Sequence, residues 1–368
     1  MFSKHKTSHA FLDSVPPSLG PSRREFLAAS LVGCAGGMLT AGLAACNGTG
    51  GRTVCNRRIG DAHAGGVLCL AVAPGGGLLA SGAEDSLVKL WRLPDGTLAG
   101  SLTGHSGAVT AVAVFPDGAL LASGGADATV RLWNLGDGSL LRTLPGHTDG
   151  VTSVVLSPGG QILASGSADA SIRLWNAADG SPIATLAGHT QAVNALAVSP
   201  DGTYLVSSAQ DSSLRLWSLP DGGLIAEVSL DAPARALAMS LDGARMASGG
   251  AAGGVVLWTM PSCTAEKVLK PTGGETHAVA MSPDKSIVAS GGIDEVVQLW
   301  RASDAVRTQT IRDHTGTIAA LAVTPDGKLL VSAGADRSIR FWQLPDGKYA
   351  GSASDPALPL REVVSFSC

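Results

Sequence analysis

The sequence predicts an all-β protein built from seven similar units, and two observations support this prediction. The first is the spacing of tryptophan, because consecutive tryptophans lie 41 or 42 residues apart along the chain. The second is the pattern inside a unit, where short apolar runs alternate with turn sequences such as Pro-Asp-Gly. A repeat of this length is typical of proteins whose units stack on one another. The chain has seven tryptophans, which are Trp91, Trp133, Trp175, Trp217, Trp258, Trp300 and Trp342.

Residues 192–230 show the elements of one unit in order. An alternating apolar stretch comes first, followed by a Pro-Asp-Gly turn and a β-rich run that ends in a tight turn at Asp211. The run Leu-Arg-Leu-Trp, a second Pro-Asp-Gly turn and a last apolar run complete the unit, which predicts four strands. Four short strands cannot bury a face alone, and closing the units into a ring leaves few exposed strand edges. We therefore predict a seven-bladed β-propeller of four-stranded antiparallel blades.

A serine, a histidine and an aspartate recur with the tryptophans at fixed distances. The serine stands ten residues before tryptophan in all seven units, the aspartate six residues before it in six units, and the histidine 28 residues before it in five. His147, Ser165 and Asp169 are the residue types of a hydrolytic triad, but an active site needs such a set only once. Recurrence at constant offsets instead indicates a structural role.

At these motifs the chain resembles the WD-repeat β-propeller family, over roughly residues 61–352. In that family tryptophan, serine, histidine and aspartate form a buried hydrogen-bonded tetrad that braces each blade. The resemblance implies such tetrads in units one to four and seven, formed by His63, Ser81, Asp85, Trp91; His105, Ser123, Asp127, Trp133; His147, Ser165, Asp169, Trp175; His189, Ser207, Asp211, Trp217; and His314, Ser332, Asp336, Trp342.

Three departures from the family pattern stand out. No tryptophan is followed by the usual aspartate. Unit five has Ala252 in place of the aspartate and no Gly-His pair, and unit six has Thr272 where the histidine would fall. We expect these two blades to be braced less well than the others.

Residues 1–46 have the layout of an export signal, with a basic region, an apolar region and small residues before a cysteine. The stretch Ser22 to Leu27 resembles the core of the twin-arginine signal, in which Arg23 and Arg24 precede Phe26 and Leu27. That pathway transports folded proteins, which suits a propeller that closes on itself.

The sequence Leu-Ala-Ala-Cys that ends at Cys46 resembles the lipobox of bacterial lipoproteins. The resemblance implies a lipid on Cys46, a tether in residues 47–60 and an extracytoplasmic, membrane-anchored protein in the periplasm or on the cell surface of a bacterium. Cys34 also matches, but it would leave a shorter apolar segment. A further alternative is that Leu27 to Ala45 stays in the membrane as an anchor.

Composition excludes several classes of function. The net charge of −4 provides no basic surface for nucleic acid, and an aromatic content of 4% argues against an aromatic cage. Neither the cysteines nor the histidines have metal-ligand spacing, and no cofactor motif is present. The resemblance to WD-repeat propellers implies a monomeric scaffold that binds an unidentified protein, and we expect neither a metal nor a cofactor. Two alternatives stay open: a secreted structural protein without a ligand, and an extracytoplasmic enzyme with a site near Glu275 and His277.

The binding surface is expected where the units differ from one another. In the WD-repeat family, partners often dock on the face around the central channel. The positions that correspond to it hold small or unremarkable residues in units one to three, apart from Glu84. Units four to six place larger or polar residues there, which predicts that they contact the partner. These residues are Asn194, Gln210, Arg235, Glu275, His277 and Ile293.

Ring closure requires a fourth strand for the last blade. Residues 344–354 closely resemble residues 93–103, so the C-terminal segment is the favoured candidate and residues 353–368 form a tail. Residues 54–59 compete for the same edge. In either case both termini lie near one seam, which predicts a disulfide between Cys55 and Cys368 in an oxidising compartment.

Overall fold

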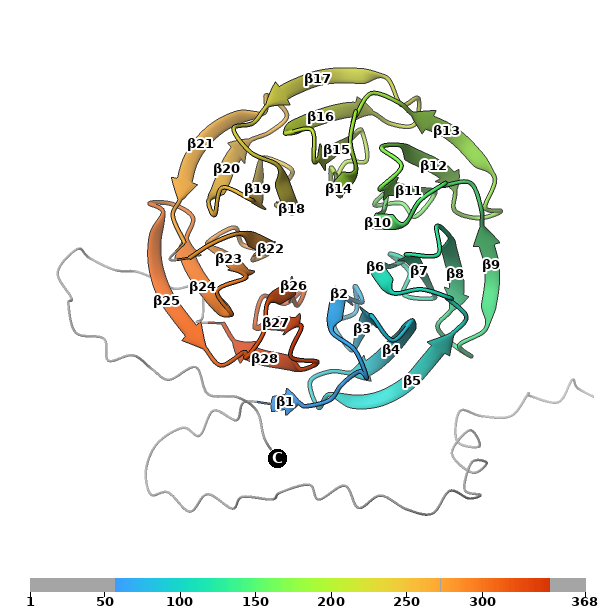
Figure 1. The fold of residues 1–368 in the computed structure, drawn as a ribbon, viewed down its shortest axis with the longest axis horizontal. Coiled ribbons are helices and arrows are strands. Elements are labelled where there is room, and N and C mark those ends of the chain that lie inside the picture. Colours follow the sequence, from blue (N-terminus) through green and yellow to red (C-terminus); the bar gives the residue numbers. More distant parts are fainter. Residues whose placement is uncertain (1–56, 272, 345–368) are drawn as a thin grey trace, which may run out of the picture. The chain divides into compact units, whose positions relative to one another are not determined.

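The computed structural model describes residues 57–271 and 273–344, and these residues form a ring of seven sheets (Figure 1). Each sheet has four antiparallel strands, and successive sheets follow one another around the ring. The prediction of a seven-bladed propeller is confirmed. Within the described ranges the regular elements are strands, and no helix there is long and apolar enough to cross a bilayer.

The strands occupy the same four positions in every blade. The innermost strands, which surround the axis of the ring, are β2 (Val67–Val72), β6 (Val109–Val114), β10 (Val151–Leu156), β14 (Val193–Val198), β18 (Ala234–Met239), β22 (Thr276–Met281) and β26 (Ile318–Val323). The second strands are β3 (Leu78–Ala83), β7 (Leu120–Gly125), β11 (Ile162–Ser167), β15 (Tyr204–Ala209), β19 (Arg245–Gly250), β23 (Ile287–Gly292) and β27 (Leu329–Gly334).

The third strands carry the seven tryptophans. They are β4 (Leu87–Arg92), β8 (Val130–Asn134), β12 (Ile172–Asn176), β16 (Ser213–Ser218), β20 (Val255–Thr259), β24 (Val296–Arg301) and β28 (Ile339–Gln343). The outer strands are β5 (Thr97–Thr103), β9 (Leu140–Leu144), β13 (Pro182–Leu186), β17 (Leu224–Ser229), β21 (Thr264–Leu269), β25 (Val306–Arg312) and β1 (Arg57–Ile59). Blade one consists of β2–β5, and the numbering continues to blade seven, which consists of β26–β28 and β1.

The core lies between neighbouring blades. Leu90 and Leu102 of blade one form one buried cluster with Val109 and Trp133 of blade two, and comparable clusters occur around the ring. The second strands are rich in alanine, serine and glycine, because the next blade approaches them closely. A Cβ atom at Gly82 would lie 2.5 Å from Val109 Cγ1, so no larger residue fits there without a shift. Each blade therefore buries its faces against its two neighbours.

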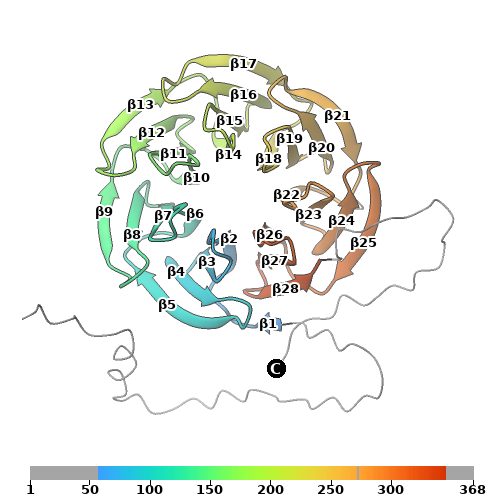
Figure 2. The same cartoon turned by 180° about the vertical axis from the view of Figure 1, so that it is seen from behind.

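The ring is closed by the N-terminal strand. β1 pairs with β28, where Arg57 lies opposite Phe341 and Ile59 opposite Ile339. This is the outer edge of blade seven, as both faces of the disc show (Figures 1 and 2). The preference for the C-terminal segment at this edge is therefore wrong, and the competing segment that includes residues 57–59 occupies it. Ile59 packs on the same cluster as Phe341 and Trp91, which stabilises the seam between blades seven and one.

Several sequence predictions concern residues outside the described ranges. These are the export signal, the predicted lipidation at Cys46 and its alternative Cys34, the C-terminal tail, and the proposed disulfide between Cys55 and Cys368.

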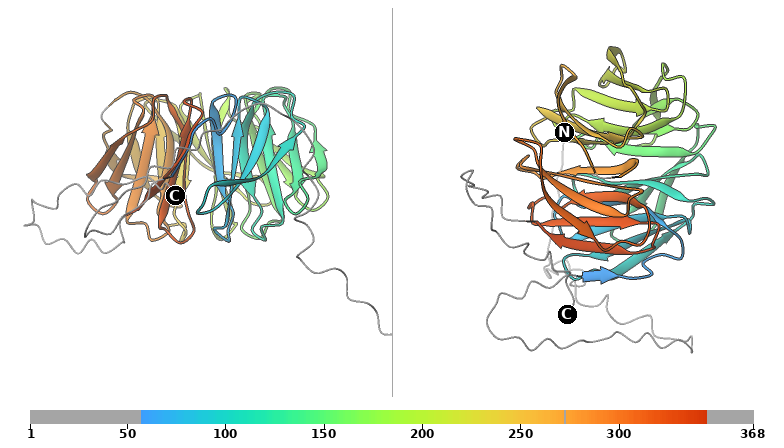
Figure 3. Two further views of the ribbon diagram at one scale, coloured as in Figure 1. Left: turned by 90° about the horizontal axis from the view of Figure 1, so that it is seen from below. Right: turned by 60° about the vertical axis from the view of Figure 1, so that its left-hand side comes forward.

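The blades stand side by side with their strands running across the thickness of the disc (Figure 3).

Candidate functional site

The recurring polar residues meet inside the blades, as blade three shows. Trp175 Nε1 donates to Ser165 Oγ over 2.9 Å. His147 lies between the serine and the aspartate, with Nε2 2.8 Å from Ser165 Oγ and Nδ1 2.9 Å from Asp169 Oδ2. An ionised aspartate only accepts, so the proton of the neutral imidazole lies on Nδ1 and the serine hydroxyl donates to Nε2. The same three contacts occur in blades one, two, four and seven.

Burial affects the protonation of the histidines in the tetrads of blades one to four. It lowers the pKa of His147, as it does for His63, His105 and His189, and the adjacent aspartates only partly oppose this shift. Burial alone would raise the pKa of Asp127, but hydrogen bonds from Thr129, the Ser106 N–H and His105 lower it to about 2. The tetrad is thus a neutral histidine beside a charged aspartate. Because each hydrogen-bonding group has a partner, the arrangement braces the blade and its serine is not exposed for attack on a substrate.

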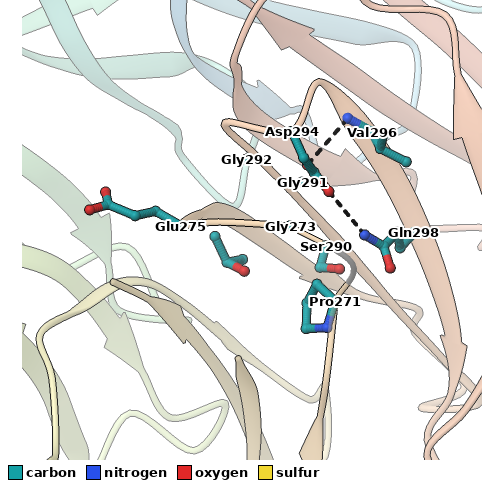
Figure 4. Close-up of a pocket in the computed structure, with 10 residues that line it drawn as sticks. Pro271, Gly273, Glu275, Ser290, Gly291, Gly292, Asp294, Val296 and Gln298 are labelled. Atoms are coloured by element: carbon teal, nitrogen blue, oxygen red, sulfur yellow. Dashed lines mark hydrogen bonds between the residues drawn. The ribbon is translucent and has the colours of Figure 1, made fainter. Parts of the chain in front are cut away.

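Blades five and six lack the full tetrad. In both blades the tryptophan indole still donates to its serine, at 2.8 Å in blade five and 3.0 Å in blade six. In blade six Asp294 accepts from the Val296 N–H at 3.3 Å and from Gln298 Nε2 at 3.1 Å (Figure 4). The residues around Asp294 leave no room for a water molecule between them, and Thr272 lies outside the described ranges.

The predicted contact residues lie at a recurring irregularity of the innermost strands. Every innermost strand has a β-bulge at its second residue, where the pairing with the second strand shifts register. A bulge redirects the side chain of the extra residue. The seven bulge residues are Leu68, Thr110, Thr152, Asn194, Arg235, His277 and Ala319.

Three of the bulge residues connect one blade to the next. Thr110 donates to the Val151 carbonyl, and Thr152 donates to the Val193 carbonyl at 2.6 Å. Asn194 does the same with the Ala234 carbonyl at 2.7 Å, and its Oδ1 accepts from Gln210 Nε2 at 3.0 Å. Asn194 therefore links blade four to blade five, and Gln210 supports it by a hydrogen bond from within blade four.

Arg235, Glu275 and His277 form a different kind of cluster. Glu275 Oε2 lies 2.9 Å from an Arg235 terminal nitrogen of the neighbouring blade and 3.2 Å from His277 Nε2. The three side chains are 35%, 36% and 28% exposed, so water and a partner can both reach them. The His277 hydrogen bond and the Arg235 charge lower the pKa of Glu275. Figure 4 shows the Glu275 side chain pointing away from Ser290 and Asp294.

Ile293 adds an apolar surface beside this cluster. The residue is 46% exposed, and its backbone N–H donates to the Glu275 carbonyl at 3.2 Å. Gly274 lies against the same side chain, because a Cβ there would be 2.5 Å from Ile293 Cδ1. The structure thus brings four of the six predicted contact residues together, whereas the side chains of Asn194 and Gln210 contact each other. We call Arg235, Glu275, His277 and Ile293 the blade 5–6 rim.

Chemistry at the rim is limited by its neighbours. Among the described residues, the ring of His277 hydrogen-bonds to Glu275, and no serine, threonine or cysteine is bonded to it. The described residues also contain no group of three or more histidine, cysteine or acidic side chains that could hold a metal ion. Cys69 and Cys263 are free thiols, and burial raises the pKa of both.

Comparison with protein families identifies repeats over more than half of the chain. The family WD40, described as WD domain, G-beta repeat, matches residues 54–92, 96–134, 138–176, 180–218, 267–301 and 305–343. The unmatched interval contains most of blade five, the blade without the histidine and the aspartate. Among curated proteins none matches the chain. The family match and the seven four-stranded blades agree with each other, and the chain therefore belongs to the WD-repeat family of β-propellers.

Proposed function

We propose that this WD-repeat propeller is an exported, lipid-anchored scaffold that binds a protein partner through the blade 5–6 rim. WD-repeat propellers commonly serve as protein-interaction scaffolds. The observation that carries the proposal for this chain is the exposed cluster of Arg235, Glu275 and His277. Exposed charges that no blade-wide bracing requires are better candidates for recognition than residues that pack blades together.

The chemistry of the rim indicates the kind of partner surface. Arg235 and His277 share one carboxylate, so the cluster presents both donors and an acceptor within a few ångströms. Ile293 offers an apolar contact at its edge. A mixed polar and apolar protein surface can satisfy all of these groups, because interfaces combine an apolar centre with hydrogen-bonding side chains.

Crosslinking of the anchored protein in its native envelope, followed by quantitative binding to the captured partner, tests this proposal. Arg235→Ala and His277→Ala should each weaken binding by about fivefold or more, which corresponds to about 1 kcal/mol. Arg337→Ala is the matched control, because Arg337 is a 51% exposed cation that pairs with Asp61 at the seam between blades seven and one. Glu84 is a poorer control, since its carboxylate accepts from the Gly66 N–H at 2.9 Å.

The pattern of effects decides the outcome. If Arg337→Ala weakens binding and the two rim variants do not, the partner docks on another sector and the rim assignment is wrong. If the captured protein is released chemically altered, with loss of that conversion in His277→Ala, the enzyme alternative near Glu275 and His277 replaces the scaffold.

A further inference from the structure

Blade five contains a cavity where the other blades hold their polar core. Its volume is about 560 Å³, within the range of sites that bind small organic molecules. The lining comes from the loop before β18, from the end of β19 and the following turn, and from β20 and β21 (Figure 1). Trp258 and Ser248 lie in its wall, and both are at least nine-tenths buried.

Blade five alone combines three replacements of polar side chains at the place of the cavity. The tetrad aspartate is replaced by Ala252, and Leu230 stands where the histidine would fall. The third replacement is Val256, two residues before the tryptophan, where the six other blades carry Lys89, Arg131, Arg173, Arg215, Gln298 and Arg340. In blade seven that arginine reaches the tetrad aspartate, with Arg340 3.0 Å from Asp336. Blade five has therefore lost an imidazole, a carboxylate and a long polar side chain from one place.

The groups that remain in the cavity are mainly hydrogen-bond donors. Ser248 Oγ accepts from the Trp258 indole at 2.8 Å, as its counterparts do, but no histidine receives its hydroxyl proton. In the other blades the backbone N–H two residues after the tetrad aspartate donates to that carboxylate, for example Ser171 to Asp169 at 2.9 Å. In blade five the corresponding N–H belongs to Gly254, and residue 252 has no carboxylate to accept it.

Charge and apolar surface in the cavity complete the description of a ligand. Lys270 lines it and supplies an ammonium group, while Val256, Val268 and Pro233 supply apolar wall. Asp231 is the single carboxylate among the lining residues; it and Lys270 are both exposed, so water and salt screen the two charges alike and the buried donors distinguish the site. We propose that this cavity binds a small organic carboxylate, whose anionic group takes the place of the missing aspartate and whose apolar body contacts Trp258.

Nuclear magnetic resonance of the full-length ¹⁵N-labelled protein can test the proposal with 2-naphthylacetate as the probe. The Trp258 indole and the Gly254 amide signals should shift saturably, and 2-naphthylacetamide should bind about tenfold more weakly, because charge-assisted hydrogen bonds are stronger than neutral ones. Equal affinity of the acid and the amide, or no shift at these two groups, would overturn the proposal.

Two variants make the test specific to the cavity. Ala252→Asp restores the internal carboxylate and should weaken the binding of 2-naphthylacetate by about tenfold or more. Ala251→Asp is the matched control, since it adds the same charge one residue away and residue 251 does not line the cavity; its affinity should stay within about threefold of the wild type. Lys270→Gln provides an independent check at an exposed position and should lower the affinity for the acid while leaving that for the amide unchanged. Unaltered binding to Ala252→Asp and Lys270→Gln would contradict the proposed site.

Discussion

Single side chains divide into those that brace the blades and those that face solvent. In the complete tetrads the histidine ring and the serine hydroxyl are buried, and each proton has one acceptor. The constant offsets of these residues from tryptophan indicated a repeated structural role, and the resemblance to the WD-repeat family supplied the prediction of which side chains meet. The internal roles of Asn194 and Gln210 could not be predicted, since their contacts depend on a β-bulge and on a carbonyl of the next blade.

The tetrads predict how stability depends on pH. Burial lowers the pKa of four tetrad histidines below the ordinary value of 6.5. As the pH falls, the unfolded chain therefore binds protons at a higher pH than the folded protein does. The four residues are His63, His105, His147 and His189. Their contribution to the free energy of unfolding is complete above pH 6.5. It is lost as the pH falls below 6.5, by up to about 1.4 kcal/mol per pH unit for each histidine. Asp127 and Asp211, with pKa values of about 2, add a second loss as the pH falls from 3.8 toward 2.

Urea unfolding at a series of pH values from 8 to 4 measures this dependence. The free energy of unfolding should be nearly constant from pH 8 to 7 and should then decrease steadily. The variant His147→Gln should be less stable at pH 7.5 but should lose less stability on acidification, because one of the titrating groups is gone. A free energy of unfolding that does not change between pH 7 and 5 would show that the tetrad histidines do not titrate as their burial requires.

Strands repeat more regularly than side chains, and this regularity made the blades predictable. The tryptophan spacing gave their number, and the turn sequences separated four strands in each. Closure was harder to predict because two segments have the pattern of an outer strand. The family matches explain the outcome: each matched repeat begins with the outer strand of the preceding blade, as residues 96–134 begin with β5. The first repeat, residues 54–92, therefore contributes β1 to blade seven.

Closure by β1 predicts that shortening an isoleucine side chain destabilises the protein more in β1 than in another outer strand. Ile59 lies in the hydrophobic cluster of the seam, whereas Ile183 of β13 is 44% exposed. Ile59→Ala should lower the free energy of unfolding by about 1–2 kcal/mol, because the residue is partly buried. Ile183→Ala should cost less than about 0.5 kcal/mol. Urea unfolding midpoints compare the two variants, and equal midpoints would indicate that β1 does not hold the ring closed in solution.

A lipid on Cys46, as we propose, would restrict how the ring can lie relative to the membrane. Ten residues, 47–56, separate Cys46 from β1, and an extended chain of this length spans at most about 36 Å. With the lipid on Cys46, the seam between blades seven and one would therefore lie no further than about this distance from the membrane. The ring places blade four across from this seam, and blades five and six lie between the two (Figure 1).

Export and lipid attachment lead to the last prediction. Arg23→Lys together with Arg24→Lys should leave the precursor in the cytoplasm, because the receptor of the twin-arginine pathway reads the arginine pair as an address. Cys46→Ala should release the protein from membranes or block its maturation, since the thiol of Cys46 is the proposed site of the lipid. Cell fractionation and the intact mass of the purified protein report both effects. Cys34→Ala is the matched control and should change neither the fractionation nor the mass.

A Cys46→Ala protein that stays membrane-bound with unchanged processing would contradict lipidation at Cys46. Release from membranes by Cys34→Ala alone would show that Cys34 carries the lipid. Retention of both single variants, with the apolar segment Leu27 to Ala45 still present in the intact mass, would instead establish that this segment is the anchor.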